Sequence, residues 1–171
     1  MSELIIYDTK SQQKQLFKPI DPKNIGIYVC GITVYDYCHI GHARTFIAFD
    51  VIVRYLKHKY GAKHVTFVRN ITDIDDKIIK RAQENNEATT QLTDRFIAAM
   101  REDETNLGLL RPDKEPRATQ YMPQMIALIE RLIAAQHAYT ADNGDVYYKV
   151  RSFEPYGCLA KRNLDDLAAG A

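Results

Sequence analysis

Two short apolar segments, separated by a stretch of helical length, constrain the fold of this chain more than any other feature. Residues 25–30 (Ile-Gly-Ile-Tyr-Val-Cys) form a compact apolar run, and residues 64–69 (His-Val-Thr-Phe-Val-Arg) are rich in β-branched and aromatic side chains, as buried strands are. Between them, from about His42 to Tyr60, apolar residues recur at helical spacing. The order strand, helix, strand predicts a βαβ unit with parallel strands and a right-handed crossover. We therefore expect a three-layer α/β arrangement with the two strands adjacent and the helix across one face.

The apolar stripe of this helix consists of Phe46, Phe49, Val53 and Leu56. On another side, Asp50 and Arg54 have the favourable acid-before-base i,i+4 order. Gly61 is a natural helix stop.

Three more helices are predicted after the second strand. The first is capped by Thr72 or Asp73 and contains Ile74, Ile78 and Ile79. The second ends at Arg111-Pro112 and is marked by Leu92, Phe96, Met100, Leu107 and Leu110. The third has core-type spacing at Met122, Met125, Ile126, Ile129, Leu132 and Ile133.

Short strands are predicted near both ends of the chain. Leu4–Tyr7 and Gln15–Phe17 lie on either side of a polar turn. Asn143-Gly144, between Ala138–Ala141 and Val146–Val150, is a strong hairpin signal.

The loop between the first strand and the long helix lies at the carboxyl edge of the expected sheet, where open α/β sheets bind ligands. His39 and His42, with Gly41 between them, lie where the helix begins. A helix N-terminus offers free N–H groups and partial positive charge, and two imidazoles there can donate to phosphate oxygens. The dinucleotide fingerprint and the P-loop motif are both absent from the sequence. The pattern thus predicts a phosphate-binding site that uses neither of these two motifs.

Composition excludes several classes of protein. The net charge is +1, from 23 basic and 22 acidic residues, so there is no global attraction to nucleic acid. Three cysteines without framework spacing argue against a disulfide scaffold. No apolar run approaches the ~20 residues of a membrane helix, and residues 1–10 do not read as a secretory signal. We expect a cytoplasmic protein.

The segment from Tyr28 to Leu56, YVCGITVYDYCHIGHARTFIAFDVIVRYL, resembles the opening of the cysteinyl-tRNA synthetases, class I enzymes that carry the His-Ile-Gly-His motif. Residues 68–77, 111–113, 116–119 and 141–146 agree with the same family, so the resemblance covers essentially the whole chain. It implies that residues 1–115 are the first half of a Rossmann-like nucleotide-binding fold and that residues 116–171 begin a connective insertion. The Lys-Met-Ser-Lys-Ser loop and the anticodon-binding region of such enzymes are absent, so the chain is expected to be an N-terminal piece of a longer, monomeric enzyme.

The resemblance also implies roles for individual residues. Cys30 corresponds to a zinc ligand, and the zinc ion binds the thiolate of the substrate cysteine. Gly31, Thr33 and Thr72 correspond to positions that line the cysteine pocket. The catalytic motif is His39, Gly41 and His42, with both imidazoles on the ATP phosphates. Zinc favours a soft thiolate over a neutral hydroxyl, which is how cysteine is distinguished from serine.

The implied reaction starts with attack of the cysteine carboxylate on the α-phosphate of ATP, supplied with magnesium, and the cysteinyl group then passes to the 3′ end of tRNA-Cys. The nucleophile is already an anion, so no general base is needed, and catalysis rests on positioning and charge stabilisation. Two alternatives stay open: a cysteine ligase with an amino-sugar acceptor, and a non-catalytic module that binds a nucleotide or a protein.

Other chemically suggestive residues have simpler interpretations. Cys38 is expected to pack and Cys158 to be inert. Residues 73, 75 and 76 are aspartates, and we expect helix capping rather than a divalent-metal cluster. We expect the remaining histidines to be structural or exposed, and the lysines near the end of the long helix to form a solvated face: His58, His64, His137, Lys57, Lys59 and Lys63. With Cys30 as the one zinc ligand found, the chain by itself is expected neither to hold zinc tightly nor to charge tRNA.

Overall fold

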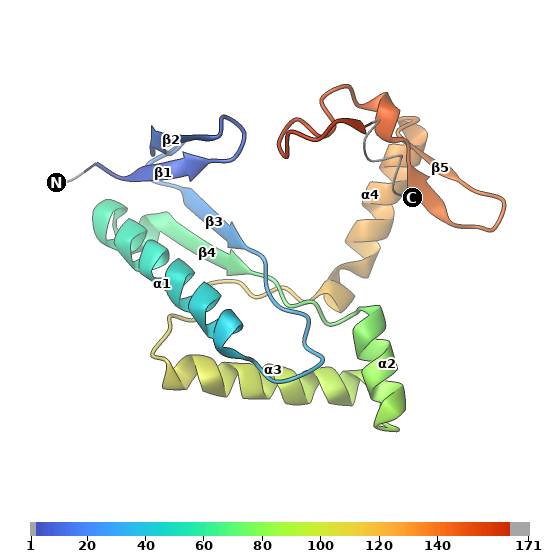
Figure 1. The fold of residues 1–171 in the computed structure, drawn as a ribbon, viewed down its shortest axis with the longest axis horizontal. Coiled ribbons are helices and arrows are strands. Elements are labelled where there is room, and N and C mark those ends of the chain that lie inside the picture. Colours follow the sequence, from blue (N-terminus) through green and yellow to red (C-terminus); the bar gives the residue numbers. More distant parts are fainter. Residues whose placement is uncertain (1–2, 165–171) are drawn as a thin grey trace. The chain divides into compact units, whose positions relative to one another are not determined.

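In the computed structural model, which describes residues 3–164, strands β3 (Ile25–Val29) and β4 (Val65–Arg69) pair in parallel. Their register runs from Ile25 opposite Val65 to Val29 opposite Arg69. Helix α1 (Ile40–Tyr60) connects the two strands and lies against the sheet (Figure 1). The predicted βαβ unit is confirmed.

One face of this sheet is buried by α1. Val29, Phe67 and Val53 of the helix form a buried cluster, and Phe49 packs against it. Strand alternation places the neighbouring residues on the opposite face, where Tyr28 is 65% exposed. The helix therefore covers a single face, as predicted.

A third parallel segment, residues 114–117, lies on the other side of β4. Isolated bridges pair Val68 with Lys114 and Ile71 with Arg117. The N–H of Arg69 donates to the carbonyl of Lys114 at 3.1 Å, and that of Ile71 to the carbonyl of Pro116 at 2.8 Å. The sequence pattern did not predict this extension of the sheet.

Two helices, α2 (Asp76–Glu84) and α3 (Thr89–Asn106), lead from β4 to this third segment. The chain passes from β3 to β4, and then from β4 to residues 114–117, in the same direction across the sheet. Right-handed connections therefore place α1 and α3 on the same face. Arg69 shows this directly, since it contacts Phe46 of α1 and Glu104 of α3. Within residues 19–122 the described sheet thus has helices on one face only, and the prediction of three layers is wrong for this unit.

The main core of residues 19–122 lies between these helices and the loop before α1. It comprises Val34, Phe46, Ile71, Ile78, Ala82, Leu92, Phe96, Ile97 and Met100. Short 3-10 turns complete the unit at Ala62–His64 and Ala118–Tyr121.

Two predicted helix ends are wrong. Helix α2 begins at Asp76 with Asp75 as its cap, and neither Thr72 nor Asp73 plays that part. Ile74 precedes the helix and is 48% exposed. Helix α3 ends at Asn106, because Gly108 takes a left-handed conformation (φ 67°) that turns the chain away.

Residues 3–18 and 123–164 belong to a second unit, described here by itself. Strands β1 (Ile5–Asp8) and β2 (Gln13–Leu16) form one antiparallel hairpin, and β5 (Ala138–Thr140) and β6 (Val146–Tyr148) form another. A 3-10 turn follows at Val150–Ser152. Both hairpins were predicted.

Helix α4 (Met122–Ala134) also lies where the periodicity predicted a helix, but it has no buried residue. Its Met125 is 41% exposed and its Ile126 50% exposed. The expectation that its methionines are core residues is wrong for the described structure. None of the helices in residues 3–164 is long and apolar enough to cross a membrane.

Candidate nucleotide site

The two motif histidines cap the first turn of α1 reciprocally. His39 is the N-cap residue, and its Nδ1 accepts a hydrogen bond from the N–H of Gly41 at 3.0 Å. In return, the N–H of His39 donates to Nδ1 of His42 at 3.1 Å. The two rings lie 3.9 Å apart between centroids, tilted by 31°.

This arrangement fixes the tautomer of both imidazoles. A neutral imidazole has one donor and one acceptor nitrogen, and here each Nδ1 accepts from the backbone. The ring proton of each histidine is therefore on Nε2, which can donate to an anion. The expectation of free backbone N–H groups is wrong for His39 and Gly41, because imidazole nitrogens accept from both of them.

Gly41 is required by the position of the His39 ring. A Cβ at residue 41 would lie 2.8 Å from Cε1 and 3.0 Å from Nδ1 of His39. Any side chain at this position displaces the ring or breaks its bond to the backbone. The glycine of the motif thus serves the geometry of the first histidine.

The pKa of His42 is lowered from its ordinary value. Partial burial disfavours the charged imidazolium, and the neighbouring His39 adds to the effect. The neutral form is also the one that can accept from the N–H of His39 at Nδ1.

Both histidines line a pocket of about 440 Å³ at the carboxyl edge of β3. The pocket also contains Gly31 and Thr33, so four of the predicted site residues meet here. Its complete lining is Gly31, Ile32, Thr33, Tyr35, Asp36, Tyr37, His39, His42 and Lys77. Two imidazoles and one ammonium group, which can donate to an anion, thus line one cavity together with the carboxylate of Asp36.

Lys77 was not predicted as a site residue. It lies in the first turn of α2, and its Nζ is 5.6 Å from the centroid of the Tyr35 ring. Its place in the pocket depends on how α2 is positioned after β4, which no local pattern reveals. Its charge adds to the capacity of the cavity to bind an anion.

Thr72 lies opposite Thr33, and the two residues form an isolated parallel bridge. The side chain of Asn70 donates to Oγ1 of Thr72 at 3.3 Å. Thr72 is thus brought next to the predicted cysteine pocket, although it does not itself line the cavity described above.

Cys30 is exposed and directly follows β3, with its Sγ 3.6 Å from the carbonyl of Gly31. Among residues 3–164 there is no group of three His, Cys, Asp or Glu side chains that could hold a metal ion. A zinc site needs at least three protein ligands. The described residues therefore do not form one by themselves, and Cys30 offers a single thiol.

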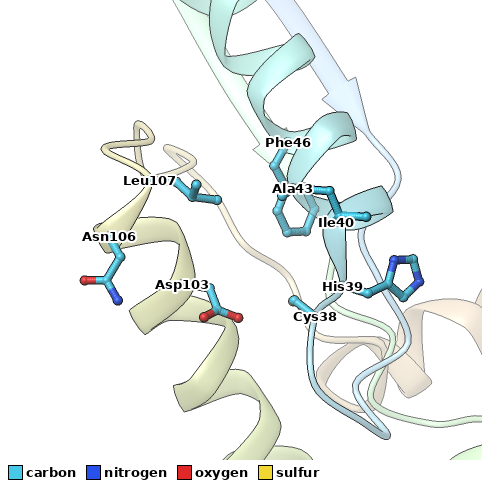
Figure 2. Close-up of a pocket in the computed structure, with 8 residues that line it drawn as sticks. All are labelled: Cys38, His39, Ile40, Ala43, Phe46, Asp103, Asn106 and Leu107. Carbon is cyan, nitrogen blue, oxygen red and sulfur yellow. The ribbon is translucent and has the colours of Figure 1, made fainter.

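A second cavity, of about 290 Å³, lies between the start of α1 and the end of α3 (Figure 2). Figure 2 shows Cys38 near this cavity, whereas the His39 ring points away from α3. Burial, together with the charges of Asp103 and Glu104, raises the pKa of Cys38 to about 11. Cys38 also packs against the main core, so the structural interpretation of this thiol is confirmed.

The three aspartates after β4 have separate roles, and the last of them, Asp76, lies in the first turn of α2, where the helix dipole favours a carboxylate. Asp73 is buried and accepts from the N–H of Thr119 at 2.9 Å and from its hydroxyl at 2.6 Å. Asp75 caps α2 by accepting from the N–H of Lys77 at 2.9 Å. The capping prediction is confirmed for Asp75 and wrong for Asp73, which ties two distant segments together.

The parallel sheet, with a His-Ile-Gly-His turn at its carboxyl edge, is the arrangement expected of an α/β catalytic domain of the class I synthetase kind. Comparison with known families agrees, since the model described as "tRNA synthetases class I (C) catalytic domain" matches residues 16–171. The chain belongs to this family.

Curated relatives are similar along the chain. It is 59% identical to cysteine–tRNA ligases of Marinobacter nauticus and Dichelobacter nodosus, over 97% and 99% of this chain. It is 56% identical to that of Actinobacillus pleuropneumoniae over 98% of this chain. The match covers only 35–37% of the length of these relatives.

Proposed function

We propose that this chain is the N-terminal catalytic part of a cysteine–tRNA ligase. The enzyme activates L-cysteine with ATP and magnesium to form cysteinyl-adenylate, and it transfers the cysteinyl group to the 3′ end of tRNA-Cys. The names of relatives at 56–59% identity support this substrate. The observation that carries the proposal is the paired His39 and His42, whose Nδ1 atoms are held by the backbone at a pocket of about 440 Å³.

In this proposal the two histidines act on the phosphates of ATP. Each Nε2–H donates to a phosphate oxygen, while the cysteine carboxylate attacks the α-phosphorus in line and pyrophosphate leaves. Negative charge builds up on the phosphate oxygens, and donors that are already oriented stabilise it without reorganisation. Lys77 adds a positive charge at the same cavity.

The capping contacts strengthen these donors. Each imidazole accepts from a backbone N–H at the positive end of α1 and donates through its other nitrogen. Hydrogen bonds in such a chain polarise one another. The helix N-terminus thus acts on the phosphates through His39 and His42 rather than through the amides of His39 and Gly41.

Gly31, Thr33 and Thr72 are proposed to bind the cysteine substrate. Cys30 is proposed as one ligand of a zinc ion whose other ligands lie outside the described residues, and which would bind the substrate thiolate in preference to a hydroxyl. The structural role of this chain in that contact is to hold Cys30 at the end of β3.

The remaining predictions are part of the same proposal. We propose that residues 1–115 are the first half of the catalytic fold and that the insertion begins at residue 116. We also propose that the complete enzyme is a cytoplasmic monomer.

The test is cysteine-dependent ATP–pyrophosphate exchange by the full-length protein, followed by transfer of labelled cysteine to tRNA-Cys or to an amino sugar. Transfer to tRNA alone supports the proposal, and transfer to the amino sugar alone would overturn it.

For the metal ligand, Cys30→Ser should lower zinc content and the preference for cysteine over serine. Full zinc occupancy with intact selectivity in Cys30→Ser would contradict the role of Cys30.

A further inference from the structure

The pairing of β3 with β4 changes register where the proposed cysteine pocket begins. Val29 pairs with Arg69, and the next bridge joins Thr33 to Thr72. Cys30, Gly31 and Ile32 thus lie opposite only two residues of the other strand. One extra residue on one strand is the definition of a β-bulge, a feature that bends the strand and redirects side chains beside active sites.

The side chain of Asn70 closes this bulge. Its Oδ1 accepts from the N–H of Gly31 at 2.8 Å, a contact that is partly buried. Regular pairing resumes beyond it, with the N–H of Thr72 donating to Ile32 at 3.1 Å and that of Val34 donating to Thr72 at 3.2 Å. The N–H that the bulge removes from the ladder is therefore satisfied by an amide oxygen.

The backbones of Gly31 and Asn70 are in close contact at this point. A Cβ on residue 31 would lie 1.6 Å from the carbonyl oxygen of Asn70, which no side chain tolerates. Gly31 is thus fixed from two directions, by the main chain of Asn70 and by its side-chain oxygen.

The same amide also sets the direction of the Thr72 hydroxyl. Because Oδ1 accepts from Gly31, the NH₂ group of Asn70 faces Thr72 and donates to its Oγ1 at 3.3 Å. A hydroxyl that accepts this hydrogen bond keeps its own proton for another partner. Thr72 therefore keeps a proton that it can donate to a substrate group.

We infer that Asn70 is the positioning residue of the cysteine pocket: it holds Gly31 on one strand and orients the Thr72 hydroxyl on the other. This role rests on the proposed function, in which Gly31 and Thr72 contact the substrate. Asn70 acts through these two residues. The role needs one acceptor and one donor on a short side chain, a combination that asparagine provides and aspartate does not.

Two substitutions in the full-length protein test this role. Asn70→Ala removes both hydrogen bonds. Asn70→Asp keeps the shape and the acceptor for Gly31, but its second carboxylate oxygen accepts the Thr72 proton, which is then no longer available to the substrate. The matched control is Asn85→Ala, at the C-terminus of α2, where the amide donates to Glu87.

The measurements are the KM values for cysteine and for ATP in pyrophosphate exchange, together with the melting temperature. We expect Asn70→Ala to raise the KM for cysteine about 10- to 100-fold, because polar groups left unpaired in a binding site weaken substrate binding strongly. The KM for ATP should change less than about twofold. Asn70→Asp should restore the melting temperature and leave the KM for cysteine high. Asn85→Ala should change neither KM.

Each result has a definite meaning. If Asn70→Asp restores the melting temperature and the KM for cysteine together, or if both KM values stay unchanged in Asn70→Ala, the positioning role is overturned while the proposed function stands. If the unsubstituted protein shows no cysteine-dependent exchange, the proposed function is overturned, and the role of Asn70 in cysteine binding with it.

Discussion

The N–H of His39 donates to Nδ1 of His42 at 3.1 Å, so the side chain that is proposed to reach phosphate also holds the first turn of its helix. The two tasks use different nitrogens of one ring. They can therefore be separated by substitutions that keep one nitrogen position and remove the other.

His42→Asn retains an acceptor at the position of Nδ1 and has no group at Nε2, whereas His42→Ala has neither. We expect both variants to lose about 10²- to 10³-fold in the rate of pyrophosphate exchange, the usual loss for an oriented donor to developing charge. His42→Ala should also lose about 1 kcal/mol of stability with the cap, and His42→Asn should lose less. Exchange kinetics and thermal melts of the full-length protein measure both effects. Near-normal exchange in His42→Asn would show that Nε2 does not serve the reaction.

The lowered pKa of His42 makes stability depend on pH with a definite sign. The unfolded chain binds more protons than the folded one between the lowered pKa and the ordinary value of about 6.5, so the free energy of unfolding rises with pH across that window. The contribution is complete above pH 6.5 and is lost as the pH falls through the folded pKa. Protonation also removes the acceptor that His42 offers to the N–H of His39.

Thermal melts at pH 7.5 and 5.5 check this sign. The drop in melting temperature between the two values should be smaller in His42→Asn than in the unsubstituted protein, because asparagine does not titrate. An equal drop in His42→Asn would contradict the assignment.

Local patterns predicted the part of the fold that depends on neighbours in sequence. The β3–α1–β4 unit and both hairpins followed from periodicity and turn chemistry. Residues 114–117 were missed as a sheet segment, because their charged residues and Pro116 do not read as a strand and only pairing with β4 makes them one. The prediction of a third layer was wrong for a similar reason. The face on which α3 lies depends on where residues 114–117 join the sheet.

Individual site residues show the same limit. The ion pair of Asp50 with Arg54 was predicted and is present at 2.6 Å. Burial of Asp50, whose carboxylate accepts from the N–H of Leu110 at 2.8 Å, was not predicted, because that partner is distant in sequence. Lys77 and Asn70 were missed for the same reason. The motif residues His39, Gly41 and His42 were found because their spacing is local.

Gly41→Ala tests whether the glycine serves the His39 ring. The added Cβ meets Cε1 at 2.8 Å, so the ring must move and the cap is disturbed. Exchange should fall by about 10-fold or more, since small misplacements of catalytic groups are costly. Stability should change little, because alanine gains about 1 kcal/mol of helix propensity against the lost contact.

Gly26→Ala is the matched control for this substitution. A Cβ at residue 26 meets nothing within 4 Å, so exchange and melting temperature should both stay near those of the unsubstituted protein. Equal exchange rates in Gly41→Ala and Gly26→Ala would remove the steric argument for the motif glycine.

Asp73 joins the segment after β4 to the one after residue 117 through two hydrogen bonds to Thr119. Asp73→Ala leaves the N–H and hydroxyl of Thr119 without this acceptor, and hydrogen bonds to a charged group contribute about 1.5–3 kcal/mol. We expect a loss of about 2–3 kcal/mol in the free energy of unfolding. Thr119→Val removes only the 2.6 Å hydroxyl bond and should cost less.

Asp75→Ala separates this contact from helix capping, because it removes only the cap of α2 and should cost about 1 kcal/mol. Denaturant unfolding measures the loss in the free energy of unfolding for the three variants. We expect the largest loss in Asp73→Ala and smaller losses in Asp75→Ala and Thr119→Val. Magnesium or calcium should not raise the melting temperature of the unsubstituted protein, since Asp73 is engaged with Thr119 and Asp75 with the N–H of Lys77. A rise that is lost in Asp73→Ala would mean that the aspartates form a metal site after all.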